Sequence, residues 1–266
     1  MELSGAVVVV TGAARGIGAA IARAVARGGA SGVLVADLDA DGAEAVAEEL
    51  RDAGCAALGR RVDVGDAGQV EAMIAAAEDE LGPVDLVVSN AGILTGLGIE
   101  ASPDDWDRAW RINVLAHVHA ARAALPGMLE RGRGAFVHTC SAAGLLTMVG
   151  DAPYTVSKHG AVAFAEWLSV TYGPRGIQVG ALCPQGVETQ LLSSGSGAVA
   201  EAAVRRAGAV LQPDEVADVV VEAVRDGRFL ILPHPEVAEH LRRKGDDPQR
   251  WLAAMQRFAG EVEAGT

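Results

Sequence analysis

Short apolar runs alternate with longer stretches of helical periodicity along almost the whole chain, and this alternation restricts the fold more than any other feature. The apolar runs are rich in Val, Ile or Leu and end at Gly or polar residues, as buried strands do. We expect strands at 6–10, 32–36, 56–62, 85–89, 135–139, 177–182 and 228–232, with those at 56–62 and 228–232 the weaker ones. We expect helices at 16–27, 41–53, 68–81, 103–125, 153–172 and 213–225. Such alternation predicts one doubly wound α/β domain, with a parallel seven-stranded sheet and helices on both faces.

Neither an internal repeat nor a linker divides the chain, so residues 1–266 are expected to form a single domain. The segment 190–212 follows the sixth expected strand and contains the run Ser-Ser-Gly-Ser-Gly, which favours a mobile substrate loop. Residues 233–266 are expected to form a helical extension, with helices at 236–244 and 248–258. Its candidate buried stripe is Val237, Leu241, Trp251, Leu252, Met255 and Phe258. This extension would either cap a site or pack on a neighbouring subunit.

Composition excludes several classes of partner. The formal net charge of −13 repels nucleic acid and anionic membrane surfaces, so neither is an expected partner. The 3 cysteines are too few for a disulfide framework, and the first residues lack the basic start of a signal peptide. These features favour a cytoplasmic protein. The 6 histidines show no zinc-ligand spacing with the cysteines, so no metal is expected.

A glycine-rich turn, TGAARGIG at 11–18, directly follows the first expected strand and leads into a helix. Glycines allow a sharp turn and a close approach of the backbone to a diphosphate, and the N–H groups of the helix then point at that anion. The loop is longer than the G-x-G-x-x-G dinucleotide fingerprint. The residues expected to bind the cofactor here are Gly12, Arg15, Gly16, Ile17 and Gly18.

The second expected strand ends at Asp37, 19 residues beyond Gly18. A carboxylate at this place can accept hydrogen bonds from both hydroxyls of an adenosine ribose and would repel a 2′-phosphate. No Lys or Arg follows Asp37 immediately to hold such a phosphate, so NAD is favoured over NADP. Two alternatives stay open: Asp37 is an ordinary strand-end residue, or Arg15 assists phosphate binding of either cofactor.

Tyr154 and Lys158 are four residues apart in the helix expected at 153–172, so they share one face. A phenol with a pKa of about 10 exchanges protons poorly at neutral pH, and a neighbouring ammonium is expected to lower that pKa. Ser141 ends the fifth strand and could hydrogen-bond the same substrate oxygen. The alternative for the Tyr-Lys pair alone is a surface i,i+4 pair.

Taken together, these residues resemble the short-chain dehydrogenase/reductase family over about 3–192. The resemblance rests on the turn at 11–18, Asp63, Asn90-Ala91-Gly92, Asn113, Ser141, Tyr154 with Lys158, and Pro184 to Thr189, all in the order and spacing of the family. It implies a Rossmann-type fold, an NAD(P) cofactor, and a homodimer or homotetramer formed through the helices at 103–125 and 153–172. The sequence is thus expected to encode an NAD-dependent oxidoreductase that interconverts an alcohol and its ketone.

The resemblance also implies roles for single residues. Tyr154 would be the general acid/base, Lys158 would hold the nicotinamide ribose, and Ser141 would orient the substrate. Asn113 would position a water that relays protons to Lys158. The further cofactor contacts implied are Asp63, Val64, Asn90, Ala91, Gly92, Tyr154, Lys158, Pro184, Val187 and Thr189.

The chain departs from the family pattern at Ser89, at Gln185 and in the extension after 232. Gln185 stands where the family commonly has Gly, so its side chain is expected to reach the substrate. The expected pocket residues, from position alone, are Leu145, Val149, Gln185, Leu191 and Leu192. They suggest a mainly apolar secondary alcohol as the small-molecule partner. The alternatives are an NADPH-linked carbonyl or ketoacyl reductase and a non-catalytic NAD(P)-sensing regulator, against which the intact set of catalytic residues argues.

Overall fold

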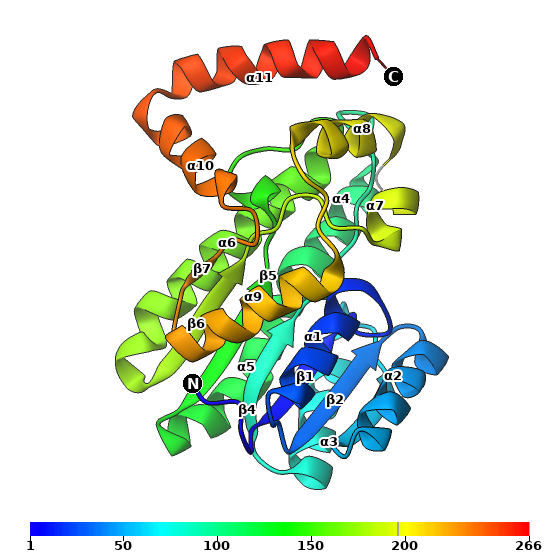
Figure 1. The fold of residues 1–266 in the computed structure, drawn as a ribbon, viewed down its shortest axis with the longest axis vertical. Helices are drawn as coiled ribbons and strands as arrows, with labels where there is room; N and C mark the ends of the chain where they lie inside the picture. The colour runs from blue at the N-terminus through cyan, green and yellow to red at the C-terminus, as the bar shows by residue number, and fades with distance from the viewer. Residues whose placement is uncertain (196, 266) are drawn as a thin grey trace.

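The computed structural model describes residues 1–195 and 197–265, and Figure 1 shows their arrangement around one twisted sheet. Ser196, within the expected substrate loop, and Thr266, at the end of the expected extension, lie outside the described residues. The predicted doubly wound domain is confirmed. None of the helices in the described part of the chain is both long and apolar enough to cross a membrane.

The sheet of the described residues has seven parallel strands in the order β3-β2-β1-β4-β5-β6-β7. The strands are β1 (Val7–Thr11), β2 (Gly32–Asp37), β3 (Ala56–Arg61), β4 (Val84–Ser89), β5 (Gly134–Thr139), β6 (Ile177–Leu182) and β7 (Leu230–Ile231). The strand order reverses between β1 and β4, where crossovers leave in opposite directions. A crevice therefore opens at the carboxyl ends of these strands.

Helices cover both faces of the sheet. One face carries α1 (Gly16–Arg27), α2 (Ala40–Asp52) and α9 (Pro213–Asp226), and the other carries α3 (Ala67–Leu81), α5 (Ala116–Arg131) and α6 (Ala152–Tyr172). Alternate residues of β1 point to opposite faces of the sheet. Val8 and Val10 lie in the core beneath α1, α2 and α9, and Val7 and Val9 lie in the core beneath α3, α5 and α6. Because both faces are buried, the central strands β1 and β4 are mostly apolar rather than alternating, whereas the edge strand β3 (Ala-Ala-Leu-Gly-Arg-Arg) is partly exposed.

The helix expected at 103–125 differs from the structure in two ways. It is divided into α4 (Pro103–Trp110), a π-helical turn at Arg111–Leu115 and α5, and it continues to Arg131. Ser102 and Asp105 form a capping box at the start of α4. A π turn inserts one residue into the helical repeat and often marks a functional position; here it contains Asn113. Apolar periodicity does not reveal one inserted residue, which explains the wrong prediction.

The segment expected as a substrate loop contains two helices, α7 (Gln190–Gly195) and α8 (Gly197–Ala207). After β7 the chain forms α10 (Glu236–Asp246) and α11 (Pro248–Glu263), which we call the C-terminal arm. Figure 1 shows the arm leaving the sheet, with α11 lying across the end of the molecule beside α8. Leu252, expected to be buried, is 52% exposed, because it lies on the outer face of α11.

Candidate active site

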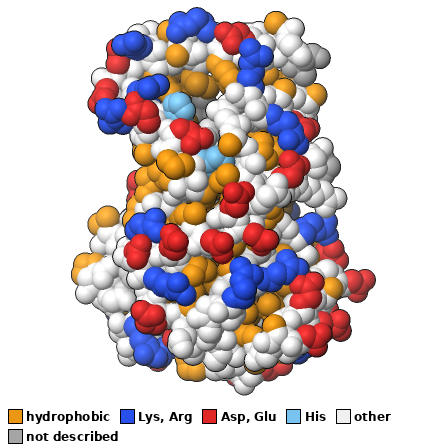
Figure 2. Space-filling model, viewed as in Figure 1, with side chains coloured by type: hydrophobic (Ala, Val, Ile, Leu, Met, Phe, Trp, Pro, Cys, Tyr) orange, Lys and Arg blue, Asp and Glu red, His pale blue; other side chains and the backbone are white. Residues whose placement is uncertain are grey.

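A cavity of about 1690 Å³ runs from the glycine turn after β1 to the inner face of the C-terminal arm. Figure 2 shows an opening into the hollow beneath the arm, edged by hydrophobic side chains. A single small-molecule site typically has about 300–1,000 Å³. The cavity is therefore large enough for a dinucleotide and a second molecule together.

The glycine turn fits a diphosphate. Gly12 and Gly16 line the cavity and have φ of +63° and +56°, a region that side chains rarely allow. A Cβ on Gly12 would lie 2.7 Å from the Ala91 Cα, so no larger residue fits. Arg15, the N-cap residue of α1, makes no side-chain cap hydrogen bond among the described residues. The first N–H groups of α1 are thus free to bind an anion.

Gly18 was expected to contact the cofactor, and this stays a prediction. Gly18 is not among the residues lining the cavity in the described chain. A Cβ at Gly18 would lie 2.2 Å from the Gly12 carbonyl oxygen and 2.6 Å from Asn90 Nδ2. Gly18 is therefore required for packing of α1 against the turn.

Asp37 holds a fixed carboxylate at the end of β2. Its Oδ2 accepts a hydrogen bond from the Ala14 N–H (3.0 Å), and its Oδ1 accepts one from the Asp39 N–H (3.0 Å). Each oxygen keeps lone-pair capacity for a further donor, and the residue lines the cavity. Arg15 also lines the cavity, but its guanidinium pairs with Asp39 and donates to Gln190 Oε1 at 2.6 Å. The one cation in this turn is thus already bound to a carboxylate.

The remaining predicted cofactor residues also reach the cavity. Asn90 braces three strand ends, because its Nδ2 donates to the Thr11 (3.0 Å) and Gly12 carbonyls while its Oδ1 accepts from Thr139 Oγ1 at 3.2 Å. A Cβ on Gly92 would lie 3.3 Å from Lys158 Nζ, so this glycine leaves the approach to Lys158 open. The cavity is lined by Ile17, Asp63, Val64, Asn90, Ala91, Gly92, Pro184, Val187 and Thr189, as well as Tyr154 and Lys158.

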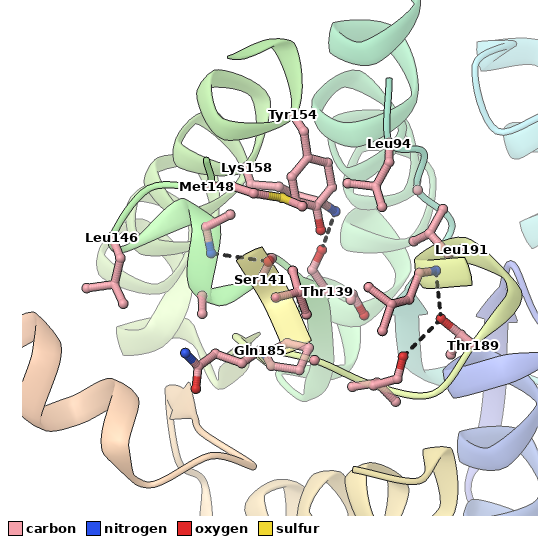
Figure 3. A pocket seen from close by; sticks show the side chains of 18 of the residues that line it. Leu94, Thr139, Ser141, Leu146, Met148, Tyr154, Lys158, Gln185, Thr189 and Leu191 are labelled. Atoms are coloured by element: carbon pink, nitrogen blue, oxygen red, sulfur yellow. Dashed lines mark hydrogen bonds between the residues drawn. The ribbon is translucent and has the colours of Figure 1, made fainter. Parts of the chain in front are cut away.

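Tyr154 and Lys158 lie one turn apart on α6, as predicted, and both are buried. Lys158 Nζ donates to the Thr139 carbonyl at 2.8 Å and lies 5.6 Å from the centroid of the Tyr154 ring. Figure 3 shows the Tyr154 phenol, Lys158 and Ser141 converging on one part of the cavity. A buried pair with fixed partners excludes the alternative of a solvated surface pair.

The pKa values differ from the sequence prediction. Burial raises the pKa of Tyr154 to about 12, although interaction with the Ser141 hydroxyl lowers it. Burial also lowers the pKa of Lys158 to about 8. In the polypeptide by itself, the lowering of the Tyr154 pKa expected from Lys158 is opposed by burial, which has the larger effect because it desolvates the phenolate.

Ser141 follows β5 in a strained conformation. Its φ of +89° makes it the one non-glycine residue with positive φ in the described part of the chain. Its Oγ accepts a hydrogen bond from the Ala143 N–H at 3.2 Å, which helps to hold this geometry. Backbone strain of this kind concentrates at functional sites, where it aims a side chain that relaxed backbone would turn away.

Asn113 lies in the π turn between α4 and α5, within the helical segment where it was expected. Its Oδ1 accepts from the Ile93 N–H (2.9 Å), and its Nδ2 donates to the Ile93 carbonyl (3.0 Å) and to Ser157 Oγ (3.0 Å). The side chain is fully buried and does not line the cavity. The amide therefore holds the segment after β4 against α6. Its Oδ1 keeps one lone pair, and a Cβ on Gly92 would lie 3.2 Å from this oxygen and 3.3 Å from Lys158 Nζ. The expected role of Asn113, positioning a water for Lys158, stays a prediction.

Sequence reasoning missed Asp151, the N-cap residue of α6. Its Oδ1 accepts from the Tyr154 N–H (2.9 Å) and from Thr95 Oγ1 (2.7 Å), and its Oδ2 accepts from the N–H groups of Thr95 (2.7 Å) and Gly96 (2.8 Å). This carboxylate, 1% exposed, ties the start of the Tyr154 helix to the loop after β4. An Asp two residues before a Pro-Tyr pair is an N-cap signal that could have identified it.

A second missed feature is a pair of buried histidines behind Lys158. His117 Nδ1 and His138 Nδ1 are 3.0 Å apart, and both rings are fully buried. Burial lowers the pKa of His138 to about 3 and places that of His117 well below its usual value. Both rings are therefore neutral at physiological pH.

The expected substrate pocket is largely in place. Val149, Gln185, Leu191 and Leu192 line the cavity, with Leu94, Leu146 and Met148 as further apolar walls (Figure 3). Leu145, also expected in the pocket, follows the 3₁₀ turn at Ala142–Gly144 and packs against the core, whereas its neighbour Leu146 lines the cavity. Gln185 Oε1 is buried and has no hydrogen-bond partner among the described residues.

The C-terminal arm closes the far side of this pocket. Lys244 Nζ donates to the carbonyls of Leu145 (2.6 Å) and Leu146 (2.9 Å), just after Ser141. Trp251, Met255 and Phe258 line the cavity from α11. Of the two possibilities that the sequence left open, capping a site is therefore the one seen within this chain.

Three comparisons agree with this geometry. The family described as short chain dehydrogenase matches residues 6–197. The 1-deoxy-11-beta-hydroxypentalenate dehydrogenase of Streptomyces exfoliatus is 35% identical over 95% of this chain and 92% of its own length. The 2-(S)-hydroxypropyl-CoM dehydrogenase 3 of Xanthobacter autotrophicus is 36% identical over 85% of this chain and 91% of its own.

A solved structure gives the same result. A short chain dehydrogenase/reductase from Burkholderia phymatum, crystallised in complex with NAD, superposes with a TM-score of 0.86. It is 31% identical, and the match covers 94% of this chain and 96% of that one. The glycine turn, the Tyr-Lys helix and these matches lead to one conclusion: the chain belongs to the short-chain dehydrogenase family of NAD(P)-dependent oxidoreductases, which act on CH–OH groups.

Proposed function

We propose that the protein uses NAD to interconvert a mainly apolar secondary alcohol and its ketone. The observation that carries the proposal is the convergence of Tyr154, Ser141 and Lys158 between the cofactor crevice and an apolar pocket. The relatives named above as dehydrogenases of hydroxylated substrates support this reaction class. Bound NAD would supply the hydride acceptor in oxidation, and NADH the hydride donor in reduction.

Tyr154 is the proposed general acid/base. In oxidation its phenolate oxygen accepts the proton of the substrate hydroxyl, and in reduction its phenol returns a proton to the carbonyl oxygen. Ser141 donates a hydrogen bond to the same substrate oxygen and orients it. With a pKa of about 12 the buried phenol is neutral in the polypeptide alone, a state suited to proton donation. Oxidation requires added positive charge to stabilise the phenolate.

Lys158 supplies part of that charge. Its ammonium is held 5.6 Å from the Tyr154 ring centroid by the Thr139 carbonyl, so it cannot swing away. Because burial places its pKa near 8, the group loses its proton within the range in which many enzymes are assayed. We therefore expect oxidation to depend on pH through both Tyr154 and Lys158, which titrate as a coupled pair.

NAD rather than NADP is the proposed cofactor, because Asp37 presents a fixed carboxylate to the cavity while Arg15 is paired with Asp39. The 2′-phosphate of NADP would be repelled by the Asp37 carboxylate. The Arg15 guanidinium would not be free to bind that phosphate. Binding of NADH and NADPH to the wild-type protein, measured by fluorescence titration, tests the choice. Tighter binding of NADPH would contradict it and favour an NADPH-linked reductase.

The reaction is tested by NAD reduction across aliphatic, cyclic, aromatic and steroidal secondary alcohols. We expect Tyr154→Phe to abolish measurable turnover while NADH binding persists. The chain's other tyrosine, Tyr172, contacts Trp167 and Arg175 outside the cavity, so Tyr172→Phe is a matched control that keeps activity. Activity that survives in Tyr154→Phe would reject the acid/base assignment. NADH binding without turnover of any alcohol would favour the regulator instead.

We also propose that the protein is a homodimer or homotetramer assembled through α4 and α6. Trp110 on α4 and Val156, Trp167 and Val170 on α6 are large apolar side chains that are between 43% and 79% exposed. Exposed apolar residues grouped in this way mark contact surfaces. Light scattering is expected to show an oligomer that Val170→Glu with Trp167→Glu dissociates. A wild-type monomer would reject the proposal.

A further inference from the structure

The inner face of α11 combines apolar and cationic side chains. Trp251, Ala254, Met255 and Phe258 recur at helical spacing and line the cavity, as do Arg250 and Arg257 on the same helix. Trp251 is the member of this stripe that packs against the small core cluster beneath the arm. The rest of the stripe faces the cavity, opposite Ala203 and Val204 of α8. This side of the cavity therefore suits an apolar ligand, with positive charge beside it.

The two arginines differ from most others on the surface. Within residues 1–195 and 197–265, neither Arg250 nor Arg257 has an ion-pair or side-chain hydrogen-bond partner. Arg243, which also lines the cavity, is paired with Glu239. Glu261, one turn beyond Arg257, is occupied by Arg206 at 3.3 Å. On α11, two guanidinium groups thus face the cavity without a carboxylate bound to them; Arg108 of α4, which also lines the cavity, is likewise without an ion pair among the described residues.

Acidic groups are also present, and their positions favour Arg257 over Arg250. Asp246 and Asp247 line the cavity at the junction of α10 and α11. Asp247 Oδ1 is engaged as the N-cap, accepting from the Arg250 N–H at 2.9 Å. Arg257 follows Asp247 by ten residues, about 15 Å along a helix, beyond the screening length of about 8–10 Å for exposed charges. The charge of Arg257 is therefore the one least compensated by these carboxylates.

We propose that Arg257, assisted by Arg250, binds a carboxylate at the end of the substrate remote from its hydroxyl, so that the preferred substrate is a long apolar hydroxy acid. This inference rests on the proposed function, because it places the hydroxyl at Tyr154 and the carboxylate at α11. The apolar walls Leu146, Met148 and Phe258 would contact the chain between the two ends. The planar guanidinium fork matches a carboxylate with two parallel hydrogen bonds.

Matched alcohols test the proposal. NAD reduction is measured with hydroxy acids that carry the hydroxyl on the penultimate carbon, with their methyl esters, and with 2-alkanols of equal chain length. Beyond the chain length that spans the cavity, we expect the KM of the acid to be at least about 10-fold below that of its ester, the usual size of a charge-assisted hydrogen bond. Arg257→Gln is expected to remove most of this difference, and Arg250→Gln part of it, because the KM of the acid rises toward that of its ester in each variant.

Arg242 provides the matched control. It is an arginine of the same arm that does not line the cavity, so Arg242→Gln should leave the preference for acids intact. A second variant, Arg257→Glu, should weaken the acids further and improve alcohols that carry an ammonium group instead. Equal KM values for acid and ester at every chain length in the wild type would overturn the inference, as would equal losses in Arg242→Gln and Arg257→Gln.

Failure of the carboxylate site and failure of the proposed function give different results in these assays. Turnover of 2-alkanols that depends on Tyr154, without a preference for acids, would overturn the carboxylate site and leave the proposed function in place. Absence of turnover with every alcohol, acid and ester would overturn both. The thermal unfolding temperature of each variant is compared with that of the wild type, to test whether a changed KM comes from misfolding.

Discussion

The strand-end side of the cavity and the C-terminal arm hold their side chains in different ways. At the strand ends, Asn113, Asp151 and Lys158 are buried, and each makes hydrogen bonds to backbone or side-chain partners. In the arm, by contrast, Val237 and Val262 are the buried residues among those described in α10 and α11. The catalytic side chains are thus fixed by many short-range contacts, and the arm by a few anchors.

This difference indicates that the two regions tolerate substitution differently and have different roles. A buried polar group with missing partners costs about 1–3 kcal/mol, so the strand-end network tolerates few substitutions. Exposed positions of the arm change at little cost to stability. Segments with few buried contacts are also the ones that open most easily. We expect the strand ends to determine the reaction and the arm to determine which alcohol reacts.

The chain has two lysines, Lys158 on the strand-end side and Lys244 in the C-terminal arm, and their substitution compares the two regions. We expect the larger effect on kcat at Lys158. Lys158→Met should lower kcat about 10²–10⁴-fold, because the cation beside the Tyr154 phenol is lost. The pH profile of kcat should move to higher pH in the same variant. Stopped-flow kinetics from pH 6 to 10 measures both. A kcat of Lys158→Met within 3-fold of wild type would contradict the idea that the strand-end side determines the reaction.

Asp37→Ser tests the cofactor end of the strand-end side. The KM for NAD should rise about 10–100-fold, because hydrogen bonds to a charged group are worth about 1.5–3 kcal/mol. The KM for NADP should fall, because the repelling carboxylate is gone. Initial rates with each cofactor report both changes. Asp41→Ser, an exposed change in the first turn of α2 outside the cavity, is the control and should alter neither value.

Lys244→Met tests the anchor of the arm. Losing the hydrogen bonds to the Leu145 and Leu146 carbonyls should raise the KM for the alcohol about 10-fold, while kcat changes less than about 2-fold. Steady-state kinetics separates the two parameters, and Lys244→Arg should restore much of the loss. A fall in kcat as large as that of Lys158→Met would show that the arm also positions the catalytic groups.

The smallest effect on turnover is expected from the buried histidine pair, which instead makes stability depend on pH. His138 has a pKa of about 3 in the folded protein, against about 6.5 when unfolded. Below pH 6.5 the unfolded chain therefore binds the extra proton, and stability falls by about 1.4 kcal/mol per pH unit for this group. Urea unfolding at pH 7, 6 and 5 measures the slope.

The double variant His117→Leu with His138→Leu should flatten that slope, because neither position then titrates. An unchanged slope in the double variant would show that other groups cause the acid sensitivity. Wild-type kcat at pH 7 should persist in the double variant, since neither ring lines the cavity.

Much of the fold and of the reactive centre could be predicted from local signals. The seven expected strands correspond to β1–β7. The strong runs mark strands buried on both faces, which are mostly apolar, and the two weaker runs correspond to the partly exposed β3 and the two-residue β7. Tyr154 and Lys158 share a helix face because four residues make about one turn. Gly12 and Gly16 adopt positive φ, as a tight turn at a helix start requires.

Several features of the site could not be predicted from local signals, because each depends on contacts between segments distant in sequence. Gly18 packs against Gly12 and Asn90, and Leu145 packs against the core. The side-chain amide of Asn113 makes hydrogen bonds to Ile93 and Ser157. The raised pKa of Tyr154 likewise reflects how completely the fold removes water from it.

The sequence by itself determined the order of strands and helices, the glycine turn, the Asp37 carboxylate and the Tyr154–Lys158 pair, because each depends on spacing within one or two neighbouring elements. Only the tertiary structure decided that α11 closes the cavity and that Arg250 and Arg257 face it without carboxylate partners. Helical spacing places residues on a face but does not say what that face meets. The partner of a face is determined by packing of the whole chain.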